Sequence, residues 1–118
     1  EIRKVFTFTR RVIFAYDGDI YNPDNIPLSP AMIAHEEVHF VQQKAVGNKE
    51  WWEAYLRDPQ FRSIQEIPAY RRQYEVAKKV ITDKNKRNDY ARKLAEALSG
   101  DTYGNCISFS DAFQFITS

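Results

Sequence analysis

Cysteine, histidine and long apolar runs are scarce in this chain. Its single cysteine, Cys106, excludes an internal disulfide framework and is typical of a protein from a reducing compartment. No apolar run approaches the length of a membrane-spanning helix, so we expect no membrane span. The first residues, Glu1 to Lys4, do not form a signal peptide, and we expect a cytoplasmic protein, although the missing initiator methionine indicates a trimmed N-terminus.

The composition indicates a folded protein. The 118 residues are 43% hydrophobic and 14% aromatic, which predicts one globular domain spanning residues 1–118. The net charge of +1 hides an uneven layout: residues 13–70 contain nine acids and four bases, whereas residues 71–93 contain nine bases and three acids. We expect the lone Cys106 to be a small buried residue rather than a nucleophile, because no histidine is left over to activate it.

Both histidines fall within one short motif, His35-Glu36-Glu37-Val38-His39, which reads H-E-x-x-H. On a helix, side chains four residues apart project from the same face, so the two imidazoles could hold one zinc ion. Glu36 borders that face and could reach a water molecule held on the ion. The motif therefore predicts a metal site with His35 and His39 as ligands and Glu36 as general base.

The residues around the motif predict a helix. Ser29 is a suitable N-cap, Pro30 suits the first helical position, and Gly47 is a plausible stop. We expect one stripe of this helix to pack on the core and the adjacent stripe to present polar ligands. The expected core stripe is Ala34, Val38, Val41 and Ala45, and the polar stripe is Met32, His35, Glu36, His39, Gln42 and Gln43.

The remaining chain predicts an α+β fold, with a small N-terminal antiparallel sheet followed by four to five helices. Residues 2–16 are rich in strand-forming side chains, and the Asp17-Gly18 turn predicts a hairpin with residues 19–21. An extended loop should then lead to the motif helix. The later helices are expected at residues 49–57, 59–82, 89–99 and 109–116, with a polar loop at residues 82–88.

Several details of these helices are testable. Pro68 should kink or loosen the third of the expected helices, because it removes a backbone N–H. Trp51, Tyr55 and Leu56 should close the core. Trp52 could pack in the core or line a substrate pocket, and we favour packing.

A catalytic zinc site needs a third protein ligand, which must here be a carboxylate because both histidines are used. Glu66 is the preferred candidate, because it lies beside apolar residues of the amphipathic helix most suited to cross the motif helix. The alternative is a solvated glutamate that forms local ion pairs with Arg62 or Arg71.

The H-E-x-x-H motif, followed by Glu66-Ile67-Pro68-Ala69-Tyr70 on a second helix, resembles the gluzincin branch of the zincin metallopeptidases over residues 29–75. Very small members occur in bacteria and their phages. The resemblance implies a zincin-like fold with the motif helix central, His35, His39 and Glu66 as Zn²⁺ ligands and Glu36 as general base. It also implies a sheet edge that could hold an extended peptide.

Two departures from the family are visible. Many gluzincins have an aspartate four residues after the glutamate ligand, where this chain has Tyr70. Its hydroxyl could support a ligand or donate to the oxyanion, and a core tyrosine with a satisfied hydroxyl is the alternative. The chain also has no third histidine to serve as a transition-state donor.

The sequence therefore predicts a zinc metallopeptidase, an enzyme that hydrolyses a peptide or protein substrate. The first alternative is a catalytically inactive zincin-like module with a structural or assembly role. The second is nucleic-acid binding through the basic residues 71–93, which we rank last because no recognised nucleic-acid motif accompanies them. The sequence does not indicate an oligomeric state.

Overall fold

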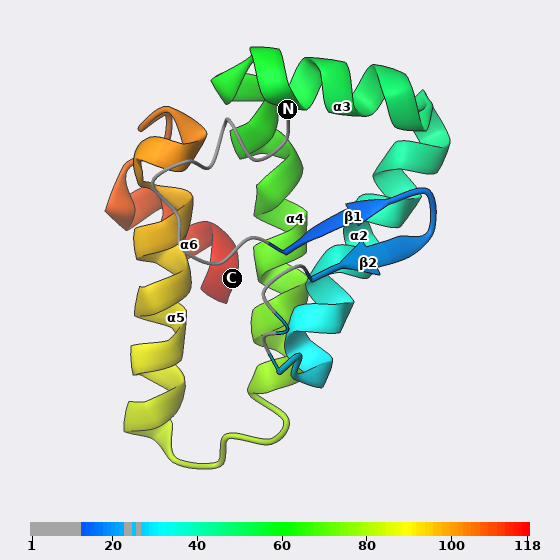
Figure 1. Ribbon diagram of the computed structural model, residues 1–118. Coiled ribbons are helices and arrows are strands. Elements are labelled where there is room, and N and C mark those ends of the chain that lie inside the picture. Colours follow the sequence, from blue (N-terminus) through cyan, green and yellow to red (C-terminus); the bar gives the residue numbers. More distant parts are fainter. Residues whose placement is uncertain (1–12, 23–24, 26) are drawn as a thin grey trace.

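The computed structural model describes residues 13–22, 25 and 27–118 of the chain (Figure 1). A two-stranded antiparallel sheet precedes five α-helices in this part of the chain, which confirms the predicted α+β class. The predicted strand-rich segment at residues 2–12 lies outside the described residues. The elements are β1 (Phe14–Tyr16), β2 (Asp19–Tyr21), α2 (Pro30–Val46), α3 (Asn48–Arg57), α4 (Pro59–Ala77), α5 (Lys84–Leu98), the 3-10 turn η1 (Asp101–Tyr103) and α6 (Phe109–Thr117).

The hairpin forms at the predicted turn and is fastened to the helices through one carbonyl group. Asp17 and Gly18 both have positive φ angles, of 50° and 82°, as a tight hairpin turn requires. The carbonyl oxygen of Ala15 accepts hydrogen bonds from Nε2 of Gln43, at 2.7 Å, and from Nε1 of Trp52, at 3.1 Å. The sheet is thus held against α2 and α3.

The helix α4 occupies the centre of the fold. Figure 1 shows α2 on one side of it, α5 on the other and α3 crossing at one end. It contacts α2, α3, α5, α6 and η1. No helix of the described residues is long and apolar enough to pass through a membrane.

The hydrophobic core lies where α3, α5 and α6 meet α4. The predicted core residues Trp51 and Tyr55 are buried, and Leu56 packs against the same cluster. Trp52 is also buried in this cluster. Its other buried members are Leu94, Ala95, Leu98, Tyr103, Ala112 and Ile116.

The expected core stripe of α2 is largely wrong. Ala34 is buried, but Val41 is 71% exposed and Ala45 is also exposed. The buried face is the polar one, including His35, His39 and Gln43. Polar side chains can be buried at low cost when they find partners, and these three find them on neighbouring elements.

Two further expectations need correction. The helix α4 ends at Ala77 rather than near Thr82. It continues through Pro68, and a kink or loosened turn at this proline stays a prediction. The helix α5 begins at Lys84 rather than at residue 89, because the Asp83 side chain caps the backbone N–H groups of Asn85 and Lys86. The sequence prediction places Asp83 in the loop at residues 82–88.

Cys106 is exposed, not buried as predicted. It follows η1 and the left-handed Gly104, where the chain turns over the surface before α6. Ser108 caps α6, because its hydroxyl accepts from the backbone N–H of Asp111 at 3.1 Å.

Candidate metal centre

The helix α2 presents both histidines on one buried face. Its predicted cap is confirmed, since the Ser29 hydroxyl accepts from the backbone N–H of Met32 at 3.2 Å, and Pro30 is the first helical residue. His35 and His39 are 7% and 4% exposed, and their ring centroids lie 5.0 Å apart. The helical spacing of the motif thus places the two imidazoles side by side.

The helix α4 brings Glu66 to the same point. Asp58 caps its first turn through the backbone N–H of Gln60 at 3.0 Å. Arg62 fixes the helix in place by donating to the carbonyl oxygens of Tyr55, at 2.8 Å, and Thr102, at 3.0 Å. One turn further along, Glu66 is 3% exposed and faces α2.

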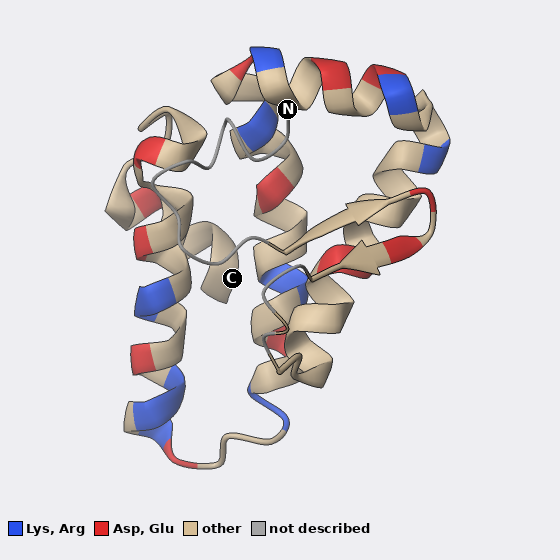
Figure 2. Cartoon of the chain, in the orientation of Figure 1, with Lys and Arg blue, Asp and Glu red and all other residues tan. Residues whose placement is uncertain are grey.

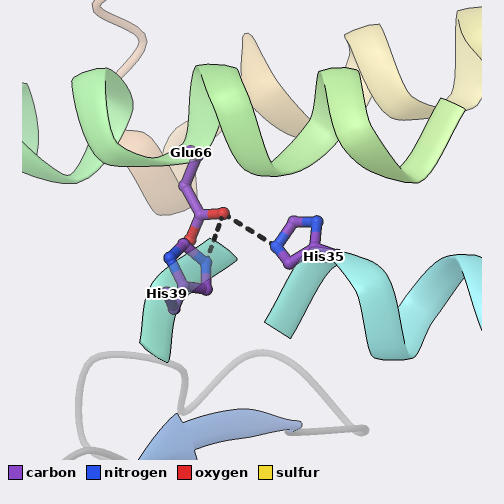
Figure 3. Close-up of side chains that lie close together, drawn as sticks. All are labelled: His35, His39 and Glu66. Carbon is purple, nitrogen blue, oxygen red and sulfur yellow. Dashed lines mark hydrogen bonds and ion pairs between the residues drawn. The ribbon is translucent and has the colours of Figure 1, made fainter. Parts of the chain in front are cut away.

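The three predicted ligands converge (Figure 3). Oε1 of Glu66 lies 2.9 Å from Nε2 of His35 and 3.0 Å from Nε2 of His39. One ligand atom from each residue lies within 4.8 Å of the others, so the group could hold a metal ion. The alternative pairing of Glu66 with Arg62 is wrong, because Arg62 uses its guanidinium on backbone carbonyls.

The electrostatics of the cluster are those of a charged group enclosed by protein. Burial opposes ionisation of Glu66, but the two imidazoles outweigh it and hold the pKa of the carboxyl well below its usual range. Burial also disfavours the charged form of His39, but the Glu66 carboxylate outweighs it and raises the pKa of the ring to about 9. A buried carboxylate beside two imidazoles suits a metal cation, which binds the rings in their deprotonated form.

Glu36 lies beside the cluster as the motif predicts. Its Oε2 is 3.8 Å from Nε2 of His35, and the residue is 8% exposed. Burial raises the pKa of Glu36, whereas the two histidines oppose this rise. A carboxyl group in this position could act as a general base, which is the role that the motif predicts.

A cavity of about 310 Å³ opens onto the cluster. Its wall combines the polar cluster and Glu36 with aromatic and aliphatic side chains from β1, α3 and α5. Trp52 both packs in the core and lines this cavity, so the two interpretations of this residue are compatible. The apolar lining includes Phe14, Met32, Trp52, Leu94 and Ala97.

Tyr70 also lines the cavity, where its ring lies edge-on to His35 with the centroids 4.6 Å apart. Its hydroxyl is 3.2 Å from the hydroxyl of Tyr103. Tyr103 reaches this position because Ser63 donates to its carbonyl oxygen at 2.8 Å and so ties η1 to α4. The pairing fits a satisfied core tyrosine, and a role for Tyr70 as oxyanion donor stays a prediction.

Sequence reasoning missed two residues that contact the ligands. Tyr55 donates a hydrogen bond to Oε2 of Glu66, and Oε1 of Gln42 lies 2.8 Å from Nδ1 of His39. Gln42 could have been found, because it lies three residues after His39 on the same helix. No sequence signal indicates the Tyr55 contact, which depends on how α3 packs against α4.

Three of the nine basic residues in the stretch 71–93 form local hydrogen bonds or ion pairs through their side chains. Arg72 pairs with Glu75, and Arg92 pairs with Asp89. Arg87 donates to two backbone carbonyls in the preceding loop. Figure 2 shows acidic and basic positions interspersed along α5. This arrangement is typical of solvated helix faces, and nucleic-acid binding stays an untested alternative.

Comparison with known proteins found no match to any family model, to any curated protein or to any solved structure.

Proposed function

We propose that this protein is a zinc-dependent metallopeptidase of the gluzincin type. The observation that supports this most is the meeting of His35, His39 and Glu66 at one point, with Glu36 beside them and a cavity in front. Two imidazole nitrogens and one carboxylate oxygen form the donor set of known catalytic zinc sites, which leave a coordination position open. The donor chemistry therefore fits zinc.

The side chains have distinct roles in peptide hydrolysis. A bound zinc ion would act as a Lewis acid that polarises the scissile carbonyl and acidifies a water molecule. Glu36 accepts a proton from the water molecule as the water oxygen forms a bond to the carbonyl carbon. Glu36 then returns this proton to the amine nitrogen as the C–N bond breaks. Tyr70, on the cavity wall, is the candidate hydrogen-bond donor to the carbonyl oxygen.

A second candidate function follows from the short distance between Glu36 and His35. If Glu36 were a fourth ligand, the site would be closed, as in structural zinc sites, and the protein would be a non-catalytic module. The two functions differ in the role of one carboxylate. The cavity in front of the cluster favours the peptidase, because a closed structural site needs no access for a substrate.

Substitution of Glu36 distinguishes the two functions. In the peptidase, Glu36→Gln should keep about one zinc ion per chain and lose hydrolysis of a denatured, fluorescently labelled protein by at least roughly a hundredfold. Glu37→Gln is the matched control, since Glu37 is the exposed neighbour and should keep both properties. Loss of zinc in Glu36→Gln would favour the structural module. Failure of the wild-type protein to bind zinc would rule out both.

A further inference from the structure

A chain of hydrogen bonds joins His39 to the backbone of the opposite helix. Oε1 of Gln42 lies 2.8 Å from Nδ1 of His39. The amide nitrogen of the same side chain donates to the carbonyl oxygen of Gln65 at 2.9 Å. One glutamine thus contacts a predicted ligand on α2 and the residue that precedes the predicted ligand Glu66 on α4.

These hydrogen bonds determine which ring nitrogen of His39 can offer its lone pair to a metal ion. A backbone carbonyl can only accept, so the NH₂ group of Gln42 must face Gln65, and its oxygen must face His39. Nδ1 of His39 therefore carries a hydrogen and donates it to Gln42. In the metal-free protein Nε2 can also carry a hydrogen and donate it to Oε1 of Glu66, 3.0 Å away. In the neutral ring that binds a metal, Nε2 is the unprotonated nitrogen.

Trp51 also connects His39 to Gln65 of α4. The Trp51 ring lies against His39 with the centroids 5.3 Å apart, and its Nε1 donates to Oε1 of Gln65 at 3.0 Å. Gln65 thus uses its backbone on Gln42 and its side chain on Trp51. Because Gln65 is adjacent to Glu66, these two bonds fix His39 relative to the carboxylate.

His35 lacks such support within the described residues. Its Nδ1 is buried without a hydrogen-bond partner, so neither its tautomer nor its ring angle is fixed by a bond at that atom. The two histidines of the motif are therefore unequal, although the sequence motif presents them as a symmetric pair.

We infer that Gln42 is a positioning residue that makes His39 the preorganised ligand of the metal site. The inference rests on the metal site of the proposed function, but not on peptide hydrolysis. An acceptor at Nδ1 aims Nε2 at the metal position and, in the neutral ring, places the hydrogen on Nδ1; partners of this kind typically contribute 10–100-fold to metal affinity. Gln42 supplies that acceptor and anchors it to α4.

The test is zinc affinity, measured on the purified full chain by competition with a chromophoric chelator. Gln42→Leu removes both hydrogen bonds and should weaken zinc binding about 10–100-fold. Gln42→Glu keeps an acceptor for Nδ1 of His39 and should stay within about threefold of the wild type. The matched control is Gln43→Leu, whose side chain is 1% exposed and bonds to the Ala15 carbonyl instead.

The control separates positioning from general loss of structure. Gln43→Leu should lower the melting temperature while keeping zinc affinity within about threefold of the wild type. Unchanged zinc affinity in Gln42→Leu would overturn the inference. So would an equal loss in Gln43→Leu, or a loss in Gln42→Glu as large as in Gln42→Leu. Wild-type protein that binds no zinc would overturn both the site and the inference.

A measurement on the wild type alone covers the case in which Gln42→Leu fails to fold. Long-range ¹H–¹⁵N NMR of the zinc-loaded protein should show the metal on Nε2 of His39 and a slowly exchanging hydrogen on Nδ1. Metal on Nδ1, or no protected hydrogen there, would overturn the inference. Absence of peptidase activity with normal zinc affinity would count against the proposed enzyme and leave the role of Gln42 standing.

Discussion

The hydroxyl of Tyr55 donates a hydrogen bond to Oε2 of Glu66. The other carboxylate oxygen, Oε1, contacts both histidines. Both oxygens of this buried carboxylate therefore have partners, and the hydrogen bond from Tyr55 fixes the rotation of the carboxyl group. The α3 helix, which contains no predicted ligand, thus takes part in shaping the candidate metal site.

Tyr55→Phe tests this contact with the loss of one oxygen atom. It leaves Oε2 of Glu66 buried without its partner, which should cost about 1–3 kcal/mol of unfolding free energy in the metal-free protein. Zinc affinity should fall roughly tenfold, because the carboxylate is no longer held in one orientation. Chelator competition and urea unfolding measure the two effects. Wild-type zinc affinity in the variant would show that Tyr55 only fills space.

The contact between His39 and Glu66 should make the stability of the metal-free protein depend on pH. Burial opposes the charge on His39, but Glu66 outweighs it and raises the pKa of the ring from 6.5 to about 9. A raised pKa stabilises the folded state below pH 6.5, and this contribution is lost as the pH rises through about 9. At 1.36 kcal/mol per pKa unit, the loss is up to about 3 kcal/mol.

Urea unfolding of chelator-treated protein at about pH 6 and about pH 9.5 measures this loss, which should largely disappear in Glu66→Gln. Zinc should reverse the trend, since it binds deprotonated imidazole and therefore stabilises the fold more as the pH rises. On the acid side, the lowered pKa of Glu66 stabilises the fold above about pH 4.5, and this contribution is lost as the pH falls. A metal-free protein more stable at the higher pH would contradict the assignment.

Two apolar positions on α2 should respond differently to the same substitution. Val41 is 71% exposed, so Val41→Gln should change the unfolding free energy by at most about 0.5 kcal/mol. Ala34 is 7% exposed, and Ala34→Gln should cost about 1–3 kcal/mol by overpacking. Thermal unfolding of the two variants compares them. Equal destabilisation by the two substitutions would indicate that Val41 is buried, as the expected core stripe requires.

Gly104 follows η1 and has a φ angle of 71°, and a Cβ atom there would lie 2.5 Å from Cβ of Pro59. Gly104→Ala should therefore combine backbone strain with a steric clash and destabilise the protein by about 2–4 kcal/mol. Gly18→Ala is the matched control, because Gly18 has a φ angle of 82° but nothing within 4 Å of the added atom. It should cost about 1 kcal/mol. Similar losses in the two variants would argue against the close approach to Pro59.

The sequence alone determined the features that depend on local spacing. His35 and His39 share a face because four residues make about one helical turn, and the caps at Ser29, Asp58 and Ser108 mark helix starts through local hydrogen bonds. Glu66 could be chosen because few carboxylates lie beside apolar residues on a separate helix. The helix start at Asp83 carried the same kind of signal, and we misread it because the lysine-rich segment after it resembled a loop.

Only the tertiary structure decided which face of α2 is buried and what surrounds the ligands. Hydrophobic spacing placed Val41 inside, whereas the fold buries the polar face, because His39, Gln42 and Gln43 find partners on Glu66, Gln65 and Ala15. Those partners lie 23–28 residues away in sequence. Periodicity shows how apolar one face of a helix is. It cannot show whether a distant segment will supply hydrogen-bond partners for the polar side chains on another face of that helix.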